Sequence, residues 1–85
     1  MPEISRFLGI VISMYYRDHE PPHFHAAYGN YELVVYLQSG VVDGKFPKRA
    51  LRLVLEWFEE HRKELEDDWK LASERKPLNA IPPLE

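Results

Sequence analysis

Gly29-Asn30, set between two segments of alternating apolar residues, is the feature that most constrains the fold of this chain. Such a dipeptide is typical of the two-residue turn that joins neighbouring antiparallel strands. We therefore expect residues 23–28 to pair with residues 31–37, with His25 opposite Val34. Because side chains alternate across a strand, this register separates two faces of the sheet. The expected core face carries Phe24, Ala26, Tyr28, Tyr31, Leu33, Val35 and Leu37, and the expected open face carries His23, His25, Ala27, Glu32, Val34 and Tyr36.

Residues 7–16 alternate in the same way and predict another strand, and residues 41–42 predict a brief additional pairing. The expected core-facing side chains of residues 7–16 are Leu8, Ile10, Ile12, Met14 and Tyr16.

From Pro47 onward, apolar residues recur at three- and four-residue steps, which predicts one long amphipathic helix over residues 47–75. Pro77 cannot continue that helix comfortably, so residues 76–85 are expected to form an extended tail. The stripe comprises Leu51, Val54, Leu55, Phe58, Leu65, Trp69 and Ala72, with Trp57 and His61 on its flank.

These elements predict an α+β fold in which a three- or four-stranded antiparallel sheet carries one long C-terminal amphipathic helix on one face. The chain has 85 residues, a length that suits one domain with a β-rich part over residues 1–46. The absence of cysteine excludes disulfides, thiolate nucleophiles and cysteine-ligated zinc. No signal peptide or membrane-spanning segment is recognisable, so we expect a cytoplasmic protein that does not bind a membrane.

Three of the four histidines lie in the segment from Asp18 to His25. Histidine titrates nearest neutral pH and is the commonest metal ligand, so this cluster indicates proton transfer or metal binding. In an extended segment, His23 and His25 project from the same face while Phe24 points the opposite way. The register also places Glu32 diagonally beside His25, where a carboxylate can orient an imidazole.

One interpretation is metal-independent cleavage of RNA, which requires a general base, a general acid and a cation for the phosphate. His23 and His25 would share the acid and base roles, with Glu32 orienting one of them. We expect no cofactor for this chemistry. The net charge of −3 argues against binding nucleic acid through bulk positive charge, so the phosphate contacts must be local. The candidate phosphate- or partner-binding residues are Arg17, Lys45, Lys48, Arg49 and Arg52, with Tyr15 and Tyr36 for base stacking.

A second interpretation is a metal site built on His23 and His25, with His19 as the first choice to complete it and Asp18, Glu20 or Glu32 as alternatives. Only two good ligands share a defined face, whereas a metal site needs three or four. We therefore expect that metal is not required for folding.

A third interpretation is an interaction module without catalysis. A helix on one face of the sheet leaves the other face bare, and Val11, Val34, Tyr15 and Tyr36 would make that face partly apolar. Such a surface suits a homodimer or a complex with another protein.

Several motifs resemble the bacterial domain-of-unknown-function family 4160 (DUF4160), and together they extend over essentially the whole chain. They are Ile4-Ser5-Arg6-Phe7 with Gly9-Ile10, Pro21-Pro22-His23-Phe24-His25-Ala26, Gly44-Lys45-Phe46-Pro47-Lys48-Arg49-Ala50-Leu51, Leu55-Glu56-Trp57, Trp69, and the tail motifs Pro77-Leu78 and Pro83-Leu84. The resemblance implies no settled activity and no catalytic residue. It does imply a gene arrangement, because members often occur beside another small domain in pairs that look like toxin and antitoxin. On that basis we expect a toxin-like component whose partner is a small antitoxin-like protein. The residue chemistry above leaves RNA open as its target.

Overall fold

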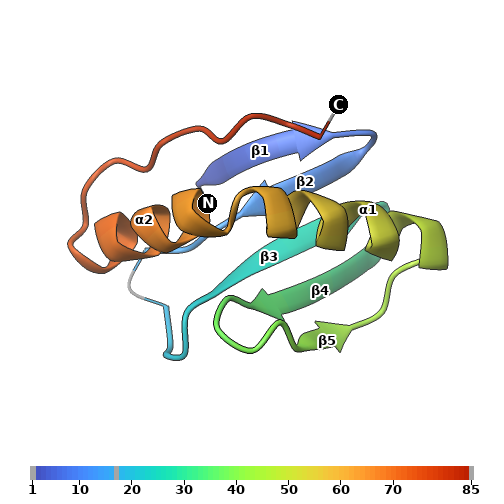
Figure 1. Ribbon diagram of the computed structural model, residues 1–85, viewed down its shortest axis with the longest axis horizontal. Coiled ribbons are helices and arrows are strands. Elements are labelled where there is room, and N and C mark those ends of the chain that lie inside the picture. The colour runs from blue at the N-terminus through green and yellow to red at the C-terminus, as the bar shows by residue number, and fades with distance from the viewer. Residues whose placement is uncertain (1, 17, 85) are drawn as a thin grey trace.

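The computed structural model describes residues 2–16 and 18–84, which form an α+β fold with a five-stranded antiparallel sheet (Figure 1). The strands follow one another across the sheet in chain order, and two helices lie against one face. The elements are β1 (Glu3–Phe7), β2 (Ile10–Ser13), β3 (His23–Tyr28), β4 (Tyr31–Tyr36), β5 (Val42–Gly44), α1 (Lys48–Glu60) and α2 (Arg62–Ser73). Neither helix in this part of the chain is both long and apolar enough to cross a bilayer.

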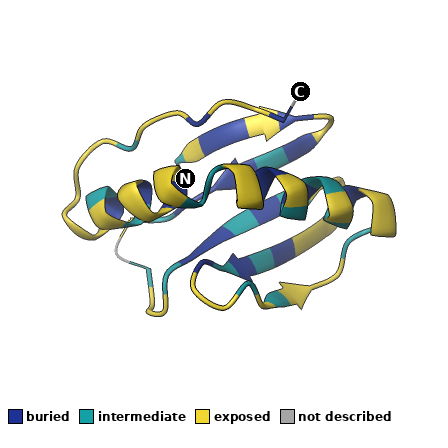
Figure 2. Cartoon of the chain, viewed as in Figure 1, coloured by how far each residue is buried: buried dark blue, intermediate teal, exposed yellow. Residues whose placement is uncertain are grey.

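The register of the central hairpin is confirmed. His25 of β3 lies opposite Val34 of β4, and His23 lies opposite Tyr36. Phe24 and Val35 are buried on the helix-covered face, as the alternation predicts. Figure 2 shows this alternation as buried residues interleaved with more exposed ones along the strands. The expectation that Tyr28 and Tyr31 belong to the core is wrong, because both side chains, which flank the turn, are exposed.

The prediction of a single strand over residues 7–16 is wrong, and the sheet therefore has more strands than expected. Leu8 and Gly9 both have positive φ angles, +52° and +83°, and form the turn of a hairpin between β1 and β2. Leu8 is 66% exposed and Tyr16 is also exposed, whereas Ile10, Ile12 and Met14 are buried as expected. Leu8 fits the apolar alternation, which conceals the turn that Gly9 makes feasible.

Replacing Leu8 with asparagine should stabilise the protein. Leu8 holds a left-handed backbone conformation that asparagine tolerates far better than leucine, and its exposed side chain fills no part of the core. The free energy of unfolding, measured by urea denaturation, should rise by about 0.5 to 1 kcal/mol. A loss of stability would show that the Leu8 side chain makes a contribution larger than its backbone strain.

The expected single helix over residues 47–75 is interrupted at His61, where φ is −125° and ψ is 25°. α1 ends there and α2 begins at the next residue. Buried positions nevertheless stay in phase across the interruption, because Phe58 and Leu65 lie two helical turns apart on either side of His61. Because the periodicity passes unbroken through His61, the apolar pattern alone cannot reveal the break. The buried helix residues are Ala50, Val54, Trp57, Phe58, Leu65, Asp68 and Ala72.

Trp57 was predicted to lie on the flank of the apolar stripe, but it lies at the centre of the core. It is 0% exposed, and its ring centroid lies 5.6 Å from that of Phe7 and 5.6 Å from that of Phe24. Leu55, which we expected in the buried stripe, is only half-buried. The side of α1 that faces the sheet is therefore rotated toward Trp57.

The C-terminal tail runs beside β1 and completes the core (Figure 1). The Ile81 N–H donates to the Ile4 carbonyl over 2.8 Å, and the Trp57 indole N–H donates to the Pro82 carbonyl over 2.9 Å. Ile81 and Leu84 are buried. The tail therefore pairs with the edge of the sheet and holds the central tryptophan in place.

Candidate functional site

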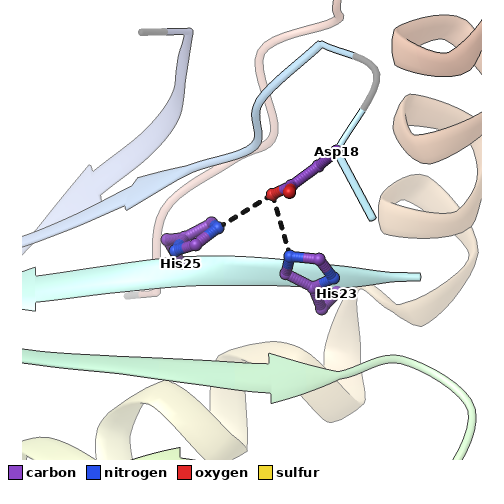
Figure 3. A group of neighbouring side chains, drawn as sticks. All are labelled: Asp18, His23 and His25. Carbon is purple, nitrogen blue, oxygen red and sulfur yellow. Dashed lines mark hydrogen bonds and ion pairs between the residues drawn. The ribbon is translucent and has the colours of Figure 1, made fainter. Parts of the chain in front are cut away.

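Asp18, His23 and His25 converge at the start of β3 (Figure 3). The Asp18 Oδ2 atom lies 2.9 Å from His23 Nε2 and 3.1 Å from His25 Nε2. The two histidines project from the same face because they are two positions apart in a strand. The loop that follows β2 returns Asp18 to that face, so one carboxylate oxygen contacts both imidazoles. We refer to these three residues as the Asp–His–His cluster.

Backbone groups hold the Asp–His–His cluster in position. The His19 N–H donates to Asp18 Oδ1 over 2.8 Å, and His23 Nδ1 lies 2.8 Å from the Pro21 carbonyl oxygen. Because a carbonyl oxygen only accepts, His23 Nδ1 carries the proton and His23 Nε2 points at Asp18. Both contacts come from the loop that contains Pro21 and Pro22, whose restricted backbone limits the orientations open to the cluster.

Partial burial acts to raise the pKa of the Asp18 carboxyl, but hydrogen bonds from His25, the His19 backbone and His23 outweigh it. The pKa of Asp18 therefore lies below its usual value. The carboxyl group is ionised at neutral pH and places a negative charge between two imidazoles.

His23 was expected on an open surface, but its side chain is covered and the residue is only 7% exposed. Its ring centroid lies 5.2 Å from that of Trp69 in α2 and 5.6 Å from that of Tyr36. His25 is more accessible and makes an edge contact with Tyr15, with 4.4 Å between ring centroids. The cluster therefore has one enclosed imidazole and one that faces the open side of the sheet.

The sheet face opposite the helices contains a cavity of about 300 Å³, which we call the open-face hollow. It begins beside the Asp–His–His cluster, since His25 belongs to both. Glu32 lies in the hollow as the register predicts, yet among the described residues the carboxylate that bonds to His25 belongs to Asp18. The residues that line the hollow are Val11, Ser13, Tyr15, His25, Ala26, Ala27, Glu32, Leu33, Val34 and Asp43.

The α1 residues expected to hold phosphate lie on the other side of the sheet from the open-face hollow. Lys48, Arg49 and Arg52 belong to α1, on the helix side of the sheet, and Arg49 lines a separate cavity with Tyr28 at the far end of β3. Lys45 follows β5 and is exposed. In the part of the chain that the structure describes, no lysine or arginine lines the open-face hollow. Arg17 lies outside the described residues.

The remaining candidates divide between the two sites. Tyr15 lines the open-face hollow, whereas Tyr36 packs on His23. The His19 side chain is not part of the converging group, and only its backbone N–H reaches Asp18. Asp18 was predicted only as an alternative metal ligand, with His19 as the first choice and Glu32 as the carboxylate that orients His25. The role of Trp69 as the cover of His23 was not predicted. The one signal for Asp18 was its place in the same proline-rich loop.

Fold and site together define a small α+β domain with a five-stranded sheet, an Asp–His–His cluster at one end of a central strand and an acidic hollow beside it. The chain belongs to the family described as domain of unknown function DUF4160, whose sequence profile matches residues 9–70. No curated protein and no solved structure shows significant similarity to the chain. The family description carries no activity, so the toxin-like pairing stays a prediction.

Proposed function

We propose that this protein is a binding module whose open-face hollow takes a positively charged side chain from a protein partner. The observation that carries this proposal is the charge of the hollow: Glu32 and Asp43 line it, and no lysine or arginine of the described residues does. Opposite charge on a partner steers association and sets specificity.

The lining of the hollow suits a long cationic side chain. Val11, Ala27 and Val34 are half-buried and provide an apolar floor, while the two carboxylates are exposed. A lysine or arginine side chain has the matching character, an aliphatic stem with a charged end. Arginine is also enriched at the centres of protein interfaces.

The same charges argue against RNA as the main ligand. A phosphate group near His25 would meet Asp18, Glu32 and Asp43, and the described basic residues of α1 lie across the sheet from it. Ribonuclease chemistry also needs a cation on the phosphate, which these residues do not supply at the imidazoles. We therefore favour a protein partner, and the product of the adjacent gene is the first candidate if the toxin-like pairing of the family applies.

Binding of a cationic peptide tests the charge preference. Chelator-treated, ¹⁵N-labelled protein is titrated with a short peptide of alternating arginine and valine, and in parallel with one of alternating glutamate and valine. Amide shifts should move at Val11, Ala27 and Val34 with the arginine peptide only. Each reversed charge contributes about 0.5 to 1 kcal/mol, so Glu32→Lys combined with Asp43→Lys should weaken binding about tenfold.

The matched control reverses two charges on the solvent side of α1, Glu56→Lys combined with Glu60→Lys, which changes the net charge equally. Equal loss of binding in both double variants would reduce the effect to bulk charge and contradict the proposal. The physiological test is co-purification with the product of the adjacent gene. A complex that survives the open-face substitutions unchanged would also contradict it.

A further inference from the structure

We propose that Asp18, His23 and His25 bind a divalent transition-metal ion of the zinc class. The three candidate ligand atoms lie within 4.8 Å of one another and come from two neighbouring segments, the loop after β2 and the start of β3. This inference goes beyond the binding of a partner in the open-face hollow. It uses different atoms, and His25 is the one residue that the two sites share.

The contacts of the Asp–His–His cluster require a cation between Asp18 Oδ2 and His23 Nε2, either a proton or a metal ion. His23 Nδ1–H donates to the Pro21 carbonyl, so His23 Nε2, 2.9 Å from Asp18 Oδ2, donates in turn only when it carries a second proton. The same oxygen also faces His25 Nε2 over 3.1 Å. Two acceptors at this separation repel each other unless a cation, either a second proton or a metal ion, lies between them.

The surrounding contacts match those of a metal-ligating histidine. Such a residue usually donates its second ring N–H to a backbone carbonyl or carboxylate, which fixes the tautomer and orients the other nitrogen toward the metal. Pro21 supplies that carbonyl for His23, and the His19 N–H holds the second carboxylate oxygen of Asp18. Trp69 and Tyr36 enclose His23 and limit the access of water. The ligands are thus oriented before any ion binds.

The two distances from Asp18 to the imidazoles require only a small adjustment. Ligand atoms about 2.1 Å from a tetrahedral zinc ion lie roughly 3.4 Å from one another. The two Asp18 contacts, at 2.9 and 3.1 Å, are a few tenths of an ångström shorter. His25, whose side chain is 30% exposed, faces the open side and can move by that amount without disturbing the core.

The donor set selects the kind of ion. Two imidazoles and one carboxylate suit zinc, cobalt, nickel, copper or iron, whereas calcium and magnesium prefer sites built from oxygen alone. Three protein ligands leave one position of a tetrahedral ion for water or an external group. The exposed edge of His25 places that side of the cluster next to the open-face hollow.

Titration of the metal-free full chain with Co²⁺ and Zn²⁺ tests the site. Co²⁺ should produce a visible ligand-field absorption that saturates at one ion per chain, and Zn²⁺ should displace it while Mg²⁺ does not. Asp18→Asn and His25→Gln should each weaken Zn²⁺ binding at least about 100-fold, because each removes a ligand. His61→Gln and His19→Gln, which remove imidazoles outside the cluster, should leave the affinity unchanged.

Thermal unfolding of each variant without metal shows whether the variant is folded. If Asp18→Asn fails to fold, the Zn²⁺ affinity of His25→Gln, a substitution on the open side of the sheet, decides the test. The metal site would be overturned if neither Co²⁺ nor Zn²⁺ bound saturably, or if Asp18→Asn and His25→Gln kept the Zn²⁺ affinity of the wild type. An equal loss of Zn²⁺ affinity in His61→Gln would also overturn it. Because the peptide titration uses chelator-treated protein, a failed metal site leaves the proposed partner binding standing, and the reverse also holds.

Discussion

Replacing Trp57 with alanine is expected to lower the free energy of unfolding by about 3 to 5 kcal/mol, the largest effect of any single side chain in this protein. Trp57 is fully buried and contacts Phe7 on β1 and Phe24 on β3, so its removal leaves a cavity between α1 and the sheet. It also leaves the Pro82 carbonyl of the tail without its donor. The measurement is urea denaturation followed by circular dichroism.

Two further variants separate the contributions. Trp57→Phe keeps most of the volume but removes the indole N–H, and it should cost about 1 kcal/mol for the lost hydrogen bond to the tail, plus a smaller cavity term. Leu55→Ala, at a half-buried position of the same helix, should cost clearly less than Trp57→Ala. Equal losses of unfolding free energy in Leu55→Ala and Trp57→Ala would show that Trp57 does not lie at the centre of the core.

Asp68→Asn is expected to stabilise the protein by about 1 to 3 kcal/mol at neutral pH, because it removes an uncompensated buried charge. Asp68 is 0% exposed, and its Oδ2 atom has no hydrogen-bond partner among the described residues. Its Oδ1 atom accepts the Asn79 N–H over 2.9 Å, a contact that the asparagine oxygen can retain.

The gain should depend on pH in a defined direction. Burial raises the pKa of Asp68; the Asn79 N–H lowers it by less, and the charges of Asp67 and Glu64 add to the increase. A carboxyl whose pKa is raised on folding stabilises the folded state fully below its unfolded pKa, and this contribution is lost as the pH rises through the folded pKa. The advantage of Asp68→Asn over the wild type should therefore grow from acidic toward neutral pH.

Urea denaturation of both proteins across that pH range measures the difference. Glu66→Gln is the matched control, because it removes one carboxylate from an exposed position of the same helix. If the free energies of unfolding of Asp68→Asn and the wild type differed by the same amount at every pH, the pKa of Asp68 would be the same in the folded and unfolded states, against the prediction.

Local sequence determined the central hairpin and the character of its two faces. Gly29-Asn30 sets the turn, and the turn sets which residues of β3 and β4 are opposite each other. Because the side-chain period of a strand is two, His25 and Glu32 necessarily share a face once that register is known. The amphipathic character of residues 47–75 likewise follows from periodicity, which is a property of neighbouring residues. DUF4160 membership was also predictable, since motifs are read directly from the residues.

Tertiary structure alone decided where separate segments meet. Apolar alternation could not show the turn at Leu8, nor could helical periodicity show the break at His61, because both patterns continue through the change of backbone direction. Asp18 reaches the histidines through a loop path that no period describes. The separation of the α1 basic residues from His25 depends on which face of the sheet the helix covers. Contacts of this kind depend on the packing of the whole chain, which a local pattern does not encode.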